Sequence, residues 1–156
     1  MLKFEIIKVD NKNYIIYDDF RKNPKIIIPK IISPFGKEIF NDVQYVNYQI
    51  DGINNDLLMD INKTEQYFKK YIKDVLKLNI IFKSSIKHFK KYKPLWKVRL
   101  NKQTSCSNNN KESILIQDFN FKLPSYIIVS LHSLWISEEN NEGGLLWILD
   151  NVESLI

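Results

Sequence analysis

Short runs of β-branched and aromatic residues, separated by turn residues, constrain the fold of this 156-residue chain more than any other feature. Such runs are typical of strands. In the first part of the chain they cover residues 2–9, 13–18, 25–32 and 38–50. The polar residues at 10–12 predict a hairpin turn between the first two runs. Pro29 predicts an edge position or a bend in the third run, because proline cannot donate a ladder hydrogen bond.

The period of the apolar residues changes after a Gly, Asn and Asp-rich loop at 51–56, and this change predicts a helix. Asn62 followed by Glu65 resembles a capping arrangement, with Asn62 as the N-cap residue. An amphipathic helix is expected over residues 63–78, with one apolar and one basic ridge: Phe68, Ile72, Val75 and Leu76, and Lys69, Lys73 and Lys77. Phe68 is therefore expected in the core. Residues 79–92 fit either a continued helix or a strand.

The second half of the chain predicts further strands. Residues 95–101 alternate, so that Trp96, Val98 and Leu100 share one face while Lys97, Arg99 and Asn101 share the other. A flexible polar loop over 102–113 and a returning strand over 114–121 predict a long hairpin with residues 95–101. The remaining expected elements are a strand over 126–137, an acidic turn over 138–144 marked by Gly143 and Gly144, and a closing helix or strand over 145–156.

These elements predict one domain that is mainly β with α. The order of strands, helix and hairpin over residues 1–121 is that of an OB-like barrel, with one or two helices between strands. Residues 122–156 are expected to form a C-terminal extension that packs on the barrel or forms an interface. A chain of this length can bury a sizeable core without disulfides or a structural metal.

Several classes of protein are excluded by composition. No apolar run approaches the roughly 18–20 residues of a membrane-spanning helix, and the N-terminal residues do not resemble a signal peptide. Cys106 is the single cysteine, and His88 and His132 are far apart in the chain, which excludes a disulfide framework and most zinc sites. We expect a cytoplasmic protein without a cofactor, in which Cys106 is an incidental free thiol in a mobile loop.

No arrangement of catalytic residues is predicted. A metal-dependent nuclease needs two or three carboxylates that converge on Mg²⁺. The candidate carboxylates have no spacing that requires this and are more economically explained as loop and cap residues: Asp18, Asp19, Asp51, Asp56, Asp60 and Asp118. Ser130 and Ser133 lack the context of a nucleophile elbow, and the chain has no phosphate-binding glycine loop. The sequence therefore predicts neither an enzyme nor a metal site.

The charges are strongly sorted along the chain. Residues 63–102 contain thirteen basic and two acidic residues, a net charge of +11. Residues 1–62 have a net charge of −1 and residues 103–156 of −5. Concentrated positive charge repels itself, and a polyanion relieves this repulsion. Nucleic acid is the commonest such partner, through phosphate neutralisation and counterion release.

Aromatic residues alternate with the lysines in this basic segment, most densely over residues 86–100. Proteins that bind single strands need both kinds of side chain, because ammonium groups neutralise phosphates and flat rings stack on bases. The residues expected to neutralise phosphates are Lys83, Lys87, Lys90, Lys91, Lys93, Lys97 and Arg99. Tyr92, Trp96, Phe89 and Tyr48 are expected to stack on bases, although Tyr92 and Trp96 fit a place in the core equally well.

The chain resembles the small single-stranded DNA-binding proteins of A/T-rich replicons, such as yeast cytoplasmic linear plasmids and large cytoplasmic DNA viruses. The resemblance rests on the size, the strand-helix-hairpin order over residues 1–121 and the tract KHFKKYKPLWKVRL. It also rests on the abundance of Ile, Lys and Asn, 24, 21 and 17 residues, which follows A/T-rich codons. The resemblance implies an OB-like barrel, sequence-tolerant binding and protection of replication intermediates.

The sequence thus favours a non-catalytic protein that binds single-stranded nucleic acid, DNA rather than RNA, in support of DNA replication. The alternative is a subunit of a replication, transcription or capping complex, whose basic face meets an acidic protein. In both cases the apolar segment 124–156 predicts a homo-oligomer or another protein interface. Binding to single strands in preference to duplex distinguishes the first function from the second.

Overall fold

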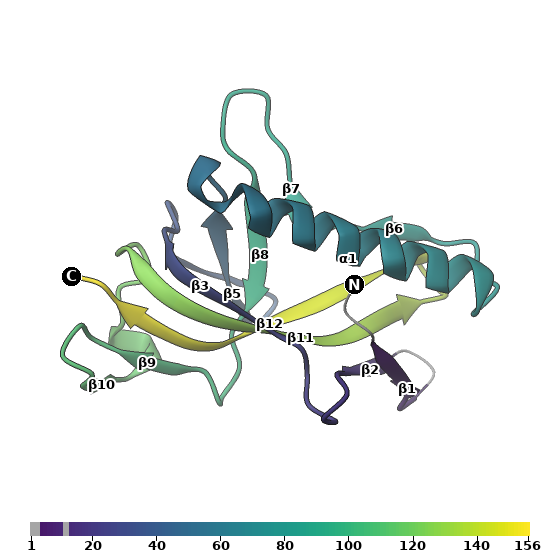
Figure 1. The fold of residues 1–156 in the computed structure, drawn as a ribbon, viewed down its shortest axis with the longest axis horizontal. Helices are drawn as coiled ribbons and strands as arrows, with labels where there is room; N and C mark the ends of the chain where they lie inside the picture. The colour runs from purple at the N-terminus through teal and green to yellow at the C-terminus, as the bar shows by residue number, and fades with distance from the viewer. Residues whose placement is uncertain (1–3, 11–12) are drawn as a thin grey trace.

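The computed structural model describes residues 4–10 and 13–156. Within these residues, one α-helix lies against a single large sheet (Figure 1). The elements are β1 (Glu5–Lys8), β2 (Asn13–Tyr17), β3 (Lys25–Ile31), β4 (Lys37–Phe40), β5 (Val43–Gln49), α1 (Asn55–Asp74), β6 (Ile81–Lys83), β7 (Ile86–Lys87), β8 (Leu95–Arg99), β9 (Ser105–Ser107), β10 (Ser113–Ile114), β11 (Ser125–Ser137) and β12 (Glu142–Ser154). Short 3-10 turns lie at Gly52–Asn54 and Ile116–Asp118.

The two longest strands, β11 and β12, form an antiparallel pair at the centre of the sheet. Strands β2 and β3 pair with different parts of β11, while β6, β8 and β9 pair with β12 in parallel. Each strand has 13 residues, and every one is buried or half-buried. The expectation that residues 122–156 form an extension is therefore wrong. Their apolar side chains belong to the core of this chain, so they no longer indicate an interface between copies.

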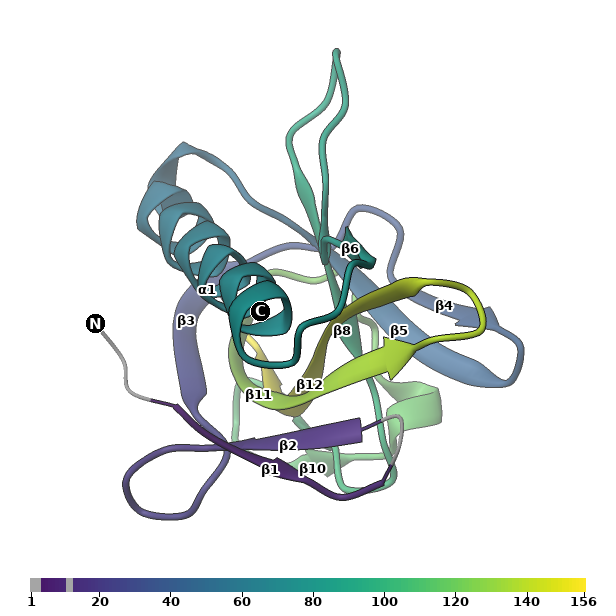
Figure 2. The same ribbon diagram turned by 90° about the vertical axis from the view of Figure 1, so that its right-hand side faces the viewer.

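The sheet curls towards a barrel (Figure 2). Strand β5 pairs with β8 and β4, and the end of β3 reaches β5 through one isolated bridge, in which Gln49 N donates to Ile32 O over 2.8 Å. The register between β3 and β11 shifts opposite Pro29, as expected for a bend at a residue that lacks a donor. The predicted fold class, mainly β with a helix between strands in an OB-like arrangement, is confirmed.

The helix begins eight residues earlier than predicted and ends four residues earlier. Leu57 and Ile61 extend the apolar stripe towards the N-terminus, and Asp51 caps the preceding 3-10 turn by accepting a hydrogen bond from Ile53 N over 3.1 Å. Asn62 is an exposed residue inside the helix, so the predicted capping role is wrong. Glu65 is buried and accepts hydrogen bonds from Ser84 Oγ and Ser85 N, at 2.5 and 3.0 Å. It fastens the helix to the segment between β6 and β7.

Residues 37–49 form a hairpin of β4 and β5 where a single strand was predicted over 38–50. Asn41 and Asp42 connect the strands with φ angles of 50° and 63°. Asn and Asp tolerate this left-handed conformation, which two-residue hairpin turns require. The predicted hairpin of the first two strands is confirmed in the pairing of β1 with β2. Residues 2, 3, 11 and 12 of that prediction lie outside the described residues.

The structure also tests the predictions for residues 79–92, for the long hairpin of residues 95–121 and for Cys106. Residues 79–92 contain the strands β6 and β7 and no helix. The predicted long hairpin is wrong, because β8 pairs with β5, β7 and β12, while β9 and β10 pair with each other. Cys106 does not lie in a mobile loop either. It is buried in β9 opposite Val152, and burial raises the pKa of its thiol to about 11.

Gly143 and Gly144 lie within β12, although a turn was predicted there. They are buried between β6 on one side and β11 on the other. A Cβ atom on Gly143 would lie 2.7 Å from Ile80 Cδ1 and 2.9 Å from Trp135 O, and one on Gly144 would lie 2.8 Å from Lys83 O. The two glycines therefore allow the close approach of β6 to β12.

We predict that Gly143→Ala lowers the free energy of unfolding by about 1–3 kcal/mol, because the added methyl group forces neighbouring backbone to move. Denaturant unfolding measures this loss. Gly52→Ala is the matched control, since a Cβ atom there meets nothing within 4 Å. Its effect should stay below about 1 kcal/mol. Equal effects of both substitutions would contradict the packing argument.

Candidate nucleic-acid interface

A basic loop projects from the sheet between β7 and β8, and Figures 1 and 2 both show it standing away from the rest of the molecule. We call residues 87–93 the arm. All of them are exposed. The arm contains Lys87, Lys90, Lys91 and Lys93, together with His88, and no acidic residue. None of the ion pairs found among the described residues involves an arm lysine. Its charges are therefore available to an anionic partner.

The arm also carries two exposed aromatic rings. The side chains of Phe89 and Tyr92 are 46% and 76% exposed. Their ring centroids lie 6.4 Å apart in an edge-to-face arrangement. Exposed rings beside ammonium groups are the combination that binds unpaired bases.

The arm leads directly into β8, whose alternation sorts its side chains onto two faces. Trp96 and Val98 point into the core, so Lys97 and Arg99 lie on the outer face. On the neighbouring strand β5, Tyr45 pairs with Arg99 and Asn47 with Lys97. The Lys97 Nζ atom lies 4.4 Å from the centroid of the Tyr45 ring, a cation–π contact. The outer face thus continues the pattern of cations and rings found in the arm.

The pKa of Lys97 is lowered by burial and by neighbouring positive charges. Partial burial lowers the pKa of Lys97, and the positive charges of Lys87 and Arg99 lower it further. The carboxylate of Glu38 acts in the opposite direction. Glu38 also accepts a hydrogen bond from Asn47 Nδ2 at 2.5 Å. A phosphate placed among Lys87, Lys97 and Arg99 would relieve the repulsion that these like charges exert on one another.

A groove of about 250 Å³ lies on the same face. Lys83, Lys97 and Arg99 line it together with the rings of Tyr45 and Trp135. Lys83 forms an ion pair with Glu142, at 3.5 Å, which joins the basic segment to the acidic C-terminal part. The groove therefore has cations and rings.

Most of the predicted site residues are brought together by this geometry. The arm contains Lys87, Phe89, Lys90, Lys91, Tyr92 and Lys93, and the adjoining sheet face contains Lys83, Lys97 and Arg99. Two predicted stacking residues lie elsewhere. Tyr48 and Trp96 are 1% and 0% exposed, and the Trp96 ring packs edge-on against Trp147 at 5.4 Å. Their predicted stacking role is wrong, because they occupy the inward positions of paired strands.

Tyr45 and Trp135 were not predicted as site residues. Tyr45 shares a face with Val43 and Asn47 in the alternation of β5, but the alternation does not say which face is inside. Trp135 comes from β11, far from the basic segment in sequence, so no local pattern relates it to Arg99. Lys69, Lys73 and Lys77, by contrast, line a different part of the surface. Phe68 is buried in the core, as predicted.

Within residues 4–10 and 13–156, no three His, Cys, Asp or Glu side chains are placed to hold a metal ion. His132 is half-buried in β11, where burial and the charge of Arg99 lower its pKa while Asp150 raises it.

No helix of the described chain combines the length and apolar character that crossing a membrane requires.

Comparisons with known proteins identify similar folds but no family. No protein-family model and no curated protein matches the sequence. The structure is similar to that of a single-stranded DNA-binding protein from bacteriophage Enc34, with a TM-score of 0.61 and 11% identity over 98% of this chain and 89% of that chain. The complex of that protein with ssDNA gives a TM-score of 0.60 at 11% identity, over 98% of this chain and 94% of the other. A C-terminal truncation gives 0.59 at 10% identity, over 97% and 94%. At these identities the similarity establishes a shared fold.

We predict that the pKa of Lys97 responds in opposite directions to two neighbouring substitutions. Lys87→Gln removes a positive charge and should raise it, whereas Glu38→Gln removes a negative charge and should lower it. NMR titration of the Lys97 side-chain resonances measures both effects. Lys22→Gln, in the distant loop between β2 and β3, should leave the Lys97 titration unchanged. The same direction of shift in both variants would contradict the proposed charge cluster.

Proposed function

We propose that this protein binds single-stranded DNA without strong sequence preference and has no catalytic activity. The observation that carries the proposal is the set of cations without acidic partners in the arm, which continues onto the outer sheet face at Lys97 and Arg99. Exposed rings accompany the cations in the arm, and the half-buried ring of Tyr45 lies beside Lys97 on the sheet face. This composition provides phosphate neutralisation and base stacking, the two interactions that sequence-tolerant binding to single strands needs.

Each part of the interface has a distinct role in the proposal. Lys87, Lys90, Lys91 and Lys93 neutralise phosphates along the arm, while Phe89 and Tyr92 stack on bases. Lys97 and Arg99 hold the backbone against the sheet beside Tyr45 and Trp135. Stacking on these rings requires bases that are not already stacked in a duplex, which favours single strands. DNA is preferred to RNA in this proposal, because the similar fold from bacteriophage Enc34 is described in complex with ssDNA.

The biological setting is part of the same proposal. Replication exposes single strands that need protection, and the bias towards Ile, Lys and Asn indicates an A/T-rich genome. A role in replicating such a genome in the cytoplasm accords with the resemblance to proteins of linear plasmids and large DNA viruses. Similarity to a bacteriophage single-stranded DNA-binding protein supports the binding activity and not this choice of host.

We predict that the variant Lys90→Gln/Lys91→Gln binds single strands more weakly and with less dependence on salt. The slope of log affinity against log salt concentration should decrease in magnitude by about 0.7 for each phosphate contact removed. Fluorescence anisotropy with labelled oligo(dT), oligo(dA) and duplex, each at several salt concentrations, measures both effects. The unmodified protein should bind the two single strands similarly and the duplex more weakly.

Lys63→Gln/Lys70→Gln is the matched control for this prediction. It removes the same charge from exposed positions on α1, outside the proposed interface. Its salt dependence should remain close to that of the unmodified protein. An equal loss in both variants would show that only net charge matters. Equal affinity for duplex and single strands would favour a subunit of a larger complex over a single-strand binder.

We further predict that Tyr92→Ala weakens oligo(dT) binding by about 1–3 kcal/mol, the usual value for loss of one stacked base. Tyr92→Phe keeps the ring and should retain most of the affinity. Because Tyr92 is largely exposed, neither substitution should change the thermal unfolding temperature appreciably. Binding of the Ala variant with unchanged affinity would remove Tyr92 from the interface.

A further inference from the structure

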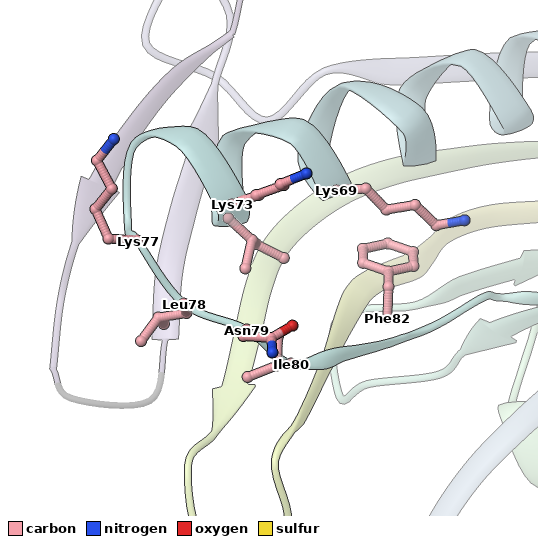
Figure 3. A pocket seen from close by; sticks show the side chains of 8 residues that line it. Lys69, Lys73, Lys77, Leu78, Asn79, Ile80 and Phe82 are labelled. Atoms are coloured by element: carbon pink, nitrogen blue, oxygen red, sulfur yellow. The ribbon is translucent and has the colours of Figure 1, made fainter.

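A second groove, of about 550 Å³, lies between the C-terminal end of α1 and the segment that leads into β6 (Figure 3). It shares no lining residue with the groove on the outer sheet face. Its size is within the range of sites that hold small ligands or a few side chains. We refer to it as the helix groove.

The apolar part of the helix groove is mostly aliphatic. Ile72, Leu78 and Ile80 line it, together with the ring of Phe82. Lys69 Nζ lies over this ring, 5.6 Å from its centroid, and Figure 3 shows the Lys69 side chain extended above it. Aliphatic surface of this kind favours a branched or aromatic side chain over a flat base.

The polar part of the helix groove is cationic. Lys69, Lys73 and Lys77 line it from the helix side, and no acidic residue is among the lining residues. None of the three lysines takes part in an ion pair identified in the described part of the chain. The groove therefore offers apolar contacts next to positive charges that form none of the ion pairs found among the described residues.

We propose that the helix groove binds an acidic peptide segment of a partner protein. One or two apolar side chains of the segment enter between α1 and residues 78–82, and flanking carboxylates meet Lys69 and Lys73. Charge complementarity and the aliphatic lining both support this occupant. The site does not depend on binding of single-stranded DNA, because it lies on a different set of residues. It would connect a protein partner to this chain while the arm remains free.

The test uses a fluorescein-labelled 12-residue peptide in which Asp and Glu alternate with Leu, Ile and Phe. We expect the intact protein to bind it, with affinity at least about fivefold lower for Lys69→Gln/Lys73→Gln. Lys63→Gln/Lys70→Gln, which removes the same charge from outside the groove, should bind the peptide like the unmodified protein. A second peptide with Ser at every apolar position should bind at least about fivefold more weakly. Methyl NMR should place the shift changes at Ile72, Leu78 and Ile80.

Three results would overturn the proposal. The first is the absence of peptide binding by the intact protein. The second is an equal loss of peptide affinity in the two lysine variants. The third is a loss of oligo(dT) affinity in Lys69→Gln/Lys73→Gln that matches the loss in Lys90→Gln/Lys91→Gln, since the groove would then belong to the path of the nucleic acid. Loss of oligo(dT) binding by the arm variant alone leaves the peptide result unaffected, so the two proposals fail independently.

Discussion

The antiparallel pairing of β11 with β12 is the interaction on which the rest of the structure depends. Both strands are covered on both faces, and their outer edges provide backbone partners for β2, β3, β6, β8 and β9. The register of the pair shifts between Ile128 and Val129 and between Leu131 and Ser133. Such irregularities bend and twist a sheet. The first shift lies within the part of β11 that pairs with β3, and the second lies between that part and the part that pairs with β2.

This central pair also decides where the positive charge of the chain is displayed. Strand β8 joins β12 through the single pair of Arg99 with Ile148, and its Trp96 and Val98 side chains enter the core. The side chains of Lys97 and Arg99 must therefore point outward. The arm, residues 87–93, leads into the N-terminal end of this strand. Like charges on the arm and on the outer face repel one another. A folded chain tolerates this repulsion where the charges are exposed to water and to counterions.

Strand β6 separates the two cationic surfaces. Its alternation places Phe82 in the helix groove and Lys83 in the groove on the outer sheet face. The strand approaches β12 closely because Gly143 and Gly144 lack side chains. Glu65 holds the segment that follows it, through Ser84 and Ser85. A short segment of ordinary composition thus sets the boundary between the proposed DNA interface and the proposed peptide site.

The sequence by itself determined the mainly β class, the existence of the helix, and the sorted basic segment with its rings, because periodicity and local charge are properties of neighbouring residues. It also placed Trp96 and Val98 on the face opposite Lys97 and Arg99. Only the tertiary structure decided which face of β8 is inside, which buried Trp96 and Tyr48 and left Tyr92 exposed. It likewise brought Trp135 beside Arg99 and placed residues 125–154 at the centre of the sheet. Strand partners distant in sequence set these outcomes, and no local pattern specifies them.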